Sequence, residues 1–158
     1  MGGMGGFDLR ELKKLQERLN GISEPEINAF IEECAKELAA RLLAKVIKRT
    51  PVGQYPAGSG KTGGTLRRGW TSAQADTAMS AKQYAESLTV RQYGGCLVIE
   101  IINPVEYASY VEFGHRTANH TGWVSGKFMM TISEQEIQSA APGILERKIS
   151  KFMKEHMP

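Results

Sequence analysis

The sequence predicts a domain that combines α-helices with antiparallel β-strands. Residues 23–50 repeat apolar side chains at helical spacing, residues 87–103 alternate around a two-glycine turn, and residues 127–156 return to helical spacing. The chain has 158 residues, of which 41% are hydrophobic and 23% charged. These values are ordinary for one globular domain, so we expect a single domain over residues 1–158.

A short amphipathic helix is predicted near the amino terminus. Residues 8–20 place Leu12, Leu15 and Leu19 on one face, and Gly21 ends the segment. A short helix with so narrow an apolar seam is stable only against a partner. Residues 1–22 are therefore expected to form a flexible helical arm that docks, most simply, on its own domain.

The clearest predicted element is a long helix that starts at Ser23. Ser23 and Glu26 have the spacing of a capping box, and Cys34 lies on the apolar stripe as a buried residue. Pro51 disfavours helical geometry at Thr50 and is expected to end the helix.

A glycine-rich loop and a strand are predicted next. Residues 53–64 lack a hydrophobic pattern and are expected to form a flexible loop, since loops of this length are usually functional or disordered. Residues 65–75 are expected to open a strand. Residues 76–86 fit either an extended turn or a helical insertion.

A β-hairpin is predicted around Gly94 and Gly95. Residues 87–93 alternate before this turn, and residues 96–103 form an almost continuous apolar run after it. A strand apolar on both faces is expected to lie centrally with both faces covered, which would also bury Cys96.

The rest of the chain is predicted to be mainly helical. The tyrosines, Val111 and Phe113 within residues 104–117 indicate a short helical turn or a strand that packs on the sheet, and residues 118–122 form a polar loop. Residues 127–138 and 142–156 have helical spacing, so they form two helices or one helix broken at Pro142.

Charge and cysteine content exclude several classes of protein. The net charge is +3, and the basic residues are mixed with acidic ones along the predicted helices. A protein built mainly to hold nucleic acid usually concentrates its basic charge on one face. The two cysteines form no disulfide framework, and neither a signal peptide nor a membrane span is recognisable, so we expect a soluble chain in a reducing compartment.

The run PAGSGKTGG at residues 56–64 raises the question of a phosphate-binding loop. Such a loop requires a glycine five positions before the Gly-Lys-Thr triplet, and that position is Tyr55. The run also follows a long helix instead of a buried strand, and the glycines at 63–64 oppose a helix directly after the triplet. A nucleotide hydrolase is therefore disfavoured.

No other group of residues indicates catalysis or a metal. Glu112, His115 and His120 do not have the spacing of a zinc site and are better explained as structural and solvated side chains. Ser59 and Ser125 lack the context of a nucleophile elbow. We expect no catalytic residue, no cofactor and no metal.

Arg67, Arg68 and Trp70 leave three interpretations open. Tryptophan and arginine beside a loop are typical of a protein interface, and they also stack on bases and bind phosphates in nucleic-acid proteins. The third interpretation is a buried Trp70 with solvated or ion-paired arginines. Because the overall basic charge is weak, a protein interface is favoured over nucleic acid.

Three segments in order resemble a known family: RTPVG at 49–53, GGTLRRGW at 63–70 and NPVEYASYVEFGHRT at 103–117. Together they are similar to the minor tail-component family of long-tailed bacteriophages and prophages, which includes head–tail joining and tail-completion proteins. The matching positions are Thr50, Pro51, Val52, Gly64, Thr65, Leu66, Arg67, Arg68, Tyr107, Ala108, Val111, Glu112, Phe113 and Gly114. The resemblance covers residues 25–158, although Lys127 and Phe128 replace a proline–phenylalanine pair typical of the family.

The resemblance implies an α+β fold, with a small, mostly antiparallel β-sheet packed against a long N-terminal helix and C-terminal helices. It implies a structural protein of the virion neck or tail that assembles in the host cytoplasm as a ring, often a hexamer. The implied partners are further copies of the chain, the head connector and the tail-tube protein. DNA would pass through such a ring without sequence-specific recognition, and the resemblance implies no catalysis and no membrane.

Residues 53–64 and 115–122 are the segments expected to touch partners. The individual contact residues predicted from the sequence are Tyr55, Lys61, Arg67, Arg68, Trp70, Glu112, His115 and Arg116. The alternative function is a small nucleic-acid-binding module that uses Lys61, the two arginines and Trp70.

Overall fold

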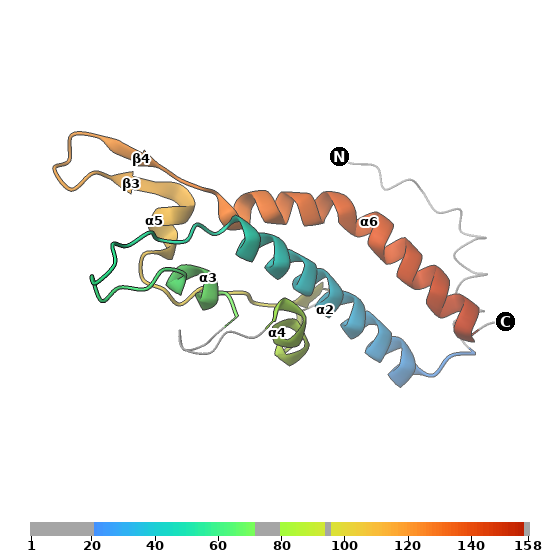
Figure 1. Ribbon diagram of the computed structural model, residues 1–158. Helices are drawn as coiled ribbons and strands as arrows, with labels where there is room; N and C mark the ends of the chain where they lie inside the picture. Colours follow the sequence, from blue (N-terminus) through green and yellow to red (C-terminus); the bar gives the residue numbers. More distant parts are fainter. Residues whose placement is uncertain (1–20, 72–79, 94–95, 157–158) are drawn as a thin grey trace.

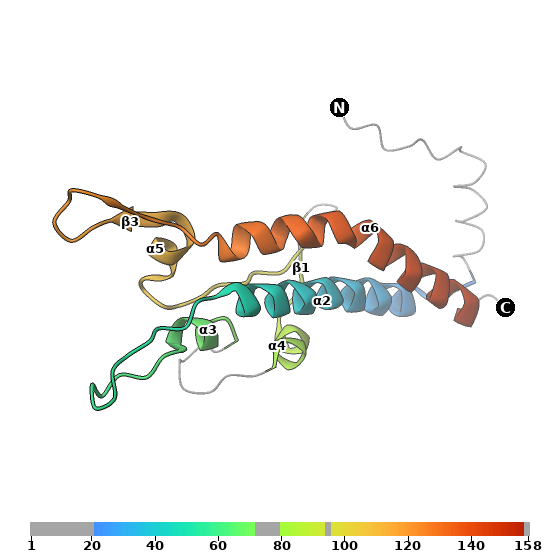
Figure 2. The same cartoon turned by 45° about the horizontal axis from the view of Figure 1, so that its top comes forward.

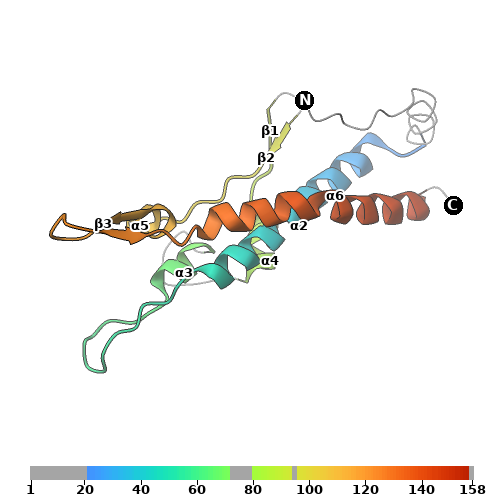
Figure 3. The ribbon, with the colours of Figure 1, turned by 90° about the horizontal axis from the view of Figure 1, so that it is seen from above.

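The computed structural model describes residues 21–71, 80–93 and 96–156. Two long helices, α2 (Glu24–Arg49) and α6 (Met129–His156), lie side by side along the length of the molecule (Figures 1 and 2). The strands form two separate two-stranded antiparallel sheets, of which the β1–β2 sheet stands away from the helices in the view from above (Figure 3). The predicted α+β class is therefore confirmed, whereas the helix predicted at 8–20 lies outside the described residues.

Helix α2 matches its predicted bounds closely. The Glu26 carboxylate accepts hydrogen bonds from the Ser23 backbone N–H at 3.1 Å and from its hydroxyl at 2.8 Å, which links the first turn to the residue before it. Thr50 has extended geometry and ends the helix before Pro51, as predicted. Cys34 is buried, also as predicted.

Helix α6 is one continuous helix, with Pro142 inside it. Proline lacks the N–H that would bond to the preceding turn, and its ring crowds that turn, so a helix commonly bends at proline. Figures 1 and 2 show such a bend partway along α6. The prediction of one helix interrupted at Pro142 was therefore closer than that of two helices.

The strand predicted at 65–75 was wrong over its described part, because α3 (Thr65–Gly69) is a short helix. Gly64 has φ +94°, a left-handed geometry that turns the chain into α3, so the glycines did not prevent a helix here. Residue 69 is glycine because a Cβ at this position would collide with the side chain of Asn103. The remaining residues, 72–79, lie outside the described part.

The ambiguous segment after residue 79 contains α4 (Ala81–Ser87). The Ser80 hydroxyl accepts a hydrogen bond from the Gln83 N–H at 3.2 Å, and the Gln83 side chain returns to Ser80. This reciprocal capping stabilises a helix start. Of the two predicted possibilities, the helical one holds for residues 81–87.

The predicted hairpin consists of β1 (Arg91–Tyr93) and β2 (Cys96–Val98), paired antiparallel with Tyr93 opposite Cys96. The prediction of a central strand with both faces covered was wrong, because β2 has only β1 as a neighbour among the described strands and is exposed. Cys96 is exposed for the same reason. Leu88 before the hairpin and Ile99 and Ile101 after it pack against the core.

Residues 104–125 form a helix followed by a second hairpin. Helix α5 (Ala108–Phe113) leads directly into β3 (Gly114–Arg116), which pairs antiparallel with β4 (Trp123–Ser125). Of the two predicted interpretations, the helical turn holds, because Tyr110, Val111 and Phe113 lie in α5. No sequence pattern predicted β4, and the polar residues 118–122 connect the two strands.

The core lies where the short helices and the start of α6 meet the middle and end of α2. Its buried side chains come from all four helices and are Ala39, Leu43, Val46, Leu66, Trp70, Ala85 and Met129. Burial of such side chains supplies the main favourable free energy of folding.

A buried polar network fixes the end of α2 to α3. The Thr50 hydroxyl donates to the Val46 carbonyl at 2.6 Å and accepts from the Trp70 indole N–H at 2.7 Å. The Thr50 carbonyl accepts two hydrogen bonds from the Arg67 guanidinium, at 2.8 and 3.2 Å. Asn103 continues this network by donating to the Leu66 carbonyl at 2.8 Å.

We predict that Thr50→Val lowers the free energy of unfolding by about 1–3 kcal/mol, because the buried indole N–H of Trp70 loses its acceptor. Thr50→Ser keeps the hydroxyl and serves as the matched control. Urea unfolding monitored by tryptophan fluorescence measures both changes. A Thr50→Val protein as stable as wild type would contradict this role.

The packing of α2 on α6 also depends on the charge of Glu136. Its carboxylate accepts hydrogen bonds from Arg49 at 3.0 Å and from Lys45 at 2.9 Å. The hydrogen bonds from Arg49 have the largest effect and those from Lys45 the next largest, and they lower the pKa of Glu136 from 4.5 to about 2. The Arg49 guanidinium also donates to Ser133, which is buried on α6.

We predict that this ion pair contributes stability above about pH 4.5 and loses its contribution as the pH falls toward 2, because the folded-state pKa lies below the ordinary value. Glu136→Gln should lower the melting temperature at pH 7 and make the acid dependence shallower. The control is Glu134→Gln, at an exposed carboxylate with no ion pair to another described residue. Parallel pH dependence in wild type and Glu136→Gln would refute the assignment.

Candidate interaction surface

Two segments project from the same end of the helix pair. One is the loop of residues 51–64 between α2 and α3, and the other is the hairpin of β3 and β4, residues 114–125, called the hairpin arm from here on. Figures 1 and 2 show both extending beyond the end of α2 and the start of α6. The surface at this end therefore consists of projecting segments attached to a helical frame.

The loop is closed at its base. The backbone of Gly63 lies directly against the carbonyl of Gly53, so the residues between them leave and return at one point. Within the loop, the Lys61 ammonium lies 5.8 Å from the centre of the Tyr55 ring, within the range of a cation–π contact. Loops with adjoining ends are compact surface units and are frequently functional.

A small pocket lies between the base of the loop and α5. It has a volume of about 200 Å³ and is lined on the loop side by Val52 and Tyr55 and on the α5 side by Tyr107 and Val111. A pocket of this size and lining can receive one apolar side chain of a partner.

Large aromatic side chains are exposed on and beside the hairpin arm. Tyr110, Phe113 and Trp123 are 60%, 61% and 62% exposed. Phe128 is exposed beside them and packs edge-on against Phe113, with ring centres 6.5 Å apart. Contiguous exposed aromatic side chains mark a binding surface more often than a free one.

Glu112 fixes the arm to the start of α6. Its buried carboxylate accepts the backbone N–H groups of Met130 and Thr131, both at 2.9 Å, and the Thr131 hydroxyl at 2.7 Å. The first N–H groups of a helix have no partner within the helix and carry partial positive charge, so a carboxylate satisfies both requirements. The Phe128 N–H also donates to the Glu112 carbonyl, which closes the base of the arm.

Gly114 permits a close approach within the arm. It has φ +88°, and a Cβ at this position would collide with the backbone of Val124 and the ring of Trp123. The Trp123 ring therefore lies over the Gly114 backbone, which holds it at the surface of the arm.

Three of the eight predicted contact residues are structural in this conformation. Trp70 is buried and bonded to Thr50, Arg67 is bonded to the Thr50 carbonyl, and the Glu112 carboxylate is buried against α6. The polar groups of these three residues are bonded inside the fold, so each has a structural role in this conformation. The stacking side chain on which the nucleic-acid alternative relied is therefore inaccessible.

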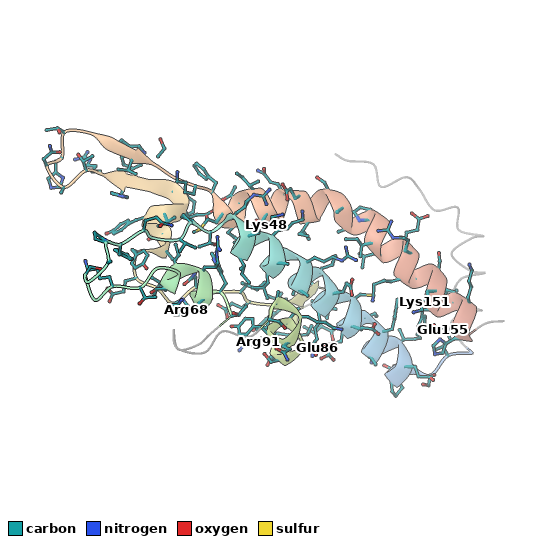
Figure 4. The ribbon with its side chains drawn as sticks, viewed as in Figure 1. Lys48, Arg68, Glu86, Arg91, Lys151 and Glu155 are labelled. Carbon is teal, nitrogen blue, oxygen red and sulfur yellow. The ribbon has the colours of Figure 1, made fainter. Side chains whose placement is uncertain are left out.

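The other five predicted residues lie at or near the projecting end. Tyr55 and Lys61 are exposed on the loop, and Arg116 is exposed on the arm. Arg68 is partly covered because it donates to the Gly63 carbonyl at the base of the loop, and Figure 4 shows it at α3. The His115 Nδ1–H donates to the Arg116 carbonyl at 2.7 Å, and the His115 ring lies 5.8 Å from Tyr110.

The arrangement offers binding chemistry and no assembled reactive centre among the described residues. Within those residues no group of three His, Cys, Asp or Glu side chains could hold a metal ion. The glycine-rich run at 56–64 lies between two helices, so it lacks the preceding strand of a phosphate-binding loop. None of the helices in the described part of the chain is long and apolar enough to cross a membrane.

Sequence reasoning missed the aromatic cluster at the base of the arm. The tyrosines and Phe113 were expected in a helical turn or in a strand that packs on the sheet. Within residues 104–117, however, the side chains that contact the core are Val105, Ala108 and Val111, while Tyr107, Tyr110 and Phe113 are exposed. Aromatic residues placed two or three positions apart around a Glu-Phe-Gly corner were the available signal, although spacing alone does not separate a buried face from an exposed one.

A comparison with protein families gives one match, over residues 13–114. The family is HK97-gp10-like, described as "Bacteriophage HK97-gp10, putative tail-component". The match begins before the resemblance noted in the sequence and ends at the start of β3, so it includes the loop and the three short helices α3, α4 and α5. Neither the comparison with curated proteins nor that with solved structures returns a match.

We predict that Glu112→Ala lowers the free energy of unfolding by about 1–3 kcal/mol, because two helix N–H groups lose their buried acceptor. Glu112→Gln keeps an acceptor oxygen and should cost less. Hydrogen exchange at Met130 and Thr131 locates the effect, since these amides should exchange faster only in the alanine variant. Unchanged exchange there would show that Glu112 does not hold the start of α6.

Proposed function

The chain belongs to the HK97-gp10-like family of bacteriophage tail components, and from that premise we propose that it is a head–tail joining, or tail-completion, protein. In this proposal it acts in the virion neck as a ring of identical subunits and enters the particle during assembly in the host cytoplasm. Its partners are the head connector on one side and the tail-tube protein on the other.

The observation that carries this proposal is the projecting end of the molecule. Exposed aromatic side chains at about 60% exposure surround the hairpin arm, beside a loop whose side chains contribute little to the core. An exposed aromatic side chain contributes much of the free energy of binding when a partner buries it. A joining protein requires such surfaces, because it must bind proteins that differ from itself.

The two projecting segments divide the proposed contacts. The hairpin arm and the end of α5 supply the apolar contact through Trp123 and Phe113, with Arg116 and His115 at the polar edge of the arm. The loop supplies Tyr55 and Lys61, and the pocket at its base receives an apolar side chain of the partner. Because the arm and the loop leave the frame at one end, one partner surface can engage both.

We predict that deletion of residues 54–63 leaves the fold intact and blocks the joining of heads to tails. The fold should survive because Gly53 already lies against Gly63, so a short connection can replace the loop. The measurement is complementation of a phage that lacks this gene, with infectious titre and electron microscopy of the particles. Separate filled heads and free tails are expected.

Two further variants test the side chains rather than the presence of the loop. Replacement of residues 54–63 by glycine and serine at the same length should also reduce the joining of heads to tails. Trp123→Ser should reduce joining because the arm loses an exposed aromatic contact. Ile149→Ser is the matched control, because Ile149 is exposed on α6 at the opposite end. If the deletion variant gave infectious particles at normal yield, the loop would be excluded as a partner contact. If tails were attached normally in the absence of this protein, the joining role would be excluded.

A further inference from the structure

The β1–β2 hairpin exposes a strand whose composition suits the interior of a sheet. From Cys96 to Ile102 the only polar side chain is that of Glu100. In the structure Leu97, Val98 and Ile102 are 40%, 41% and 57% exposed, and Tyr93 opposite them is 61% exposed. Strands apolar on both faces usually have neighbours on both sides, and an isolated two-stranded hairpin is only marginally stable.

Among the described strands, β1 and β2 pair only with each other, so the outer edge of each strand has no neighbouring strand. Tyr93 and Cys96 flank a connection of two residues, and the pair next to them is Gln92 with Leu97. Hydrogen-bonded and non-hydrogen-bonded pairs alternate, and the pair flanking a two-residue turn is hydrogen-bonded. Gln92 and Leu97 therefore direct their N–H and C=O groups outward, at the β1 edge and the β2 edge respectively.

The hairpin also carries opposite charges that suit pairing with a second copy of itself. Residues 88–103 contain one basic side chain, Arg91, and one acidic side chain, Glu100, and both are exposed. A hollow of about 630 Å³ is lined by these two side chains together with Tyr93 and Val98. Figure 3 shows that the hairpin stands clear of the helices.

We propose that neighbouring copies complete this sheet, with the outer edge of β2 in one copy pairing antiparallel with the outer edge of β1 in the next. The inference rests on the proposed ring. Each copy has one edge of each kind, so the contact is head-to-tail and closes into a ring that leaves no open edge.

Charge and side-chain size define the register between copies. Glu100 of one copy lies opposite Arg91 of the next, which places Val98 opposite Tyr93, an aromatic and β-branched pair of the kind that stabilises antiparallel strands. This register also aligns the outward backbone groups of Ile99 with those of Gln92. Within one copy Arg91 lies opposite Val98, so the register between copies is shifted by two residues. Such a stagger is required when strands close around an axis.

Cysteine cross-linking tests the register. In a Cys96→Ser background, Tyr93→Cys and Val98→Cys are made in separate chains, one of them enlarged by a tag, and both are supplied together during assembly. Non-hydrogen-bonded partners have Cα atoms about 4.5 Å apart, within reach of a disulfide. The mixed cross-link should form in assembled particles at least several-fold more than in particles made with either variant alone.

The matched control combines Tyr93→Cys with Ile149→Cys, which is exposed on α6 and should give only background cross-linking. Cross-linking by Val98→Cys alone would indicate a β2–β2 dimer and overturn the head-to-tail contact. A mixed cross-link no stronger than this control would overturn the pairing itself.

Complementation separates this inference from the proposed function. If Tyr93→Lys and Arg91→Glu support normal joining and the mixed cross-link is absent, the hairpin contact is wrong and the joining role stands. If the mixed cross-link forms but virions lacking the protein join normally, the joining role is wrong and the hairpin contact stands.

Discussion

The hydrogen bonds made by Thr50 are the interaction on which the rest of the described structure depends. Its side chain is fully buried, and its hydroxyl connects the last turn of α2 to the Trp70 indole while its carbonyl receives the Arg67 guanidinium. With no water available inside the core, loss of any partner leaves a polar group unsatisfied. The end of α2, the base of the loop and α3 are consequently held as one unit, and Asn103 attaches the chain after the first hairpin to the same unit.

Several polar side chains of this protein form hydrogen bonds inside the frame, whereas many of its large aromatic side chains are exposed. Thr50, Arg67 and Glu112 each satisfy backbone or side-chain groups of another segment. Around them the loop, the arm and the first hairpin expose tyrosine, phenylalanine and tryptophan. This division suits a subunit whose interior sets the angle of projecting segments and whose partners bury those segments. A family of tail components is a natural setting for it, since such proteins function within assemblies.

Elements that depend on interactions between residues close in sequence were predicted correctly. Ser23, Glu26 and Pro51 define α2 through capping and through the restriction that proline places on its neighbour, and the alternation around residues 94–95 predicted the first hairpin. The strand expected at 65–75 failed because Leu66 and Trp70, four positions apart, are buried together on one side of a short helical turn. The long-range bond from Asn103 is also needed to hold that turn. Arg67, Trp70 and Glu112 were proposed as contacts because nothing local distinguishes a buried, bonded side chain from an accessible one.

The sequence by itself determined the two long helices, the antiparallel hairpin and, through ordered motifs, the family. Each of these depends on neighbours within a few residues or on residue order, and both can be read along the chain. Only the tertiary structure decided which apolar residues are buried. Val98 and Phe113 are as apolar as Val46 and Met129, yet Val98 lies on the first hairpin and Phe113 at the end of α5, whereas the last two are buried in the core with α2 and the start of α6. Burial depends on which elements meet in space, and within the described residues β2 is exposed along its whole length.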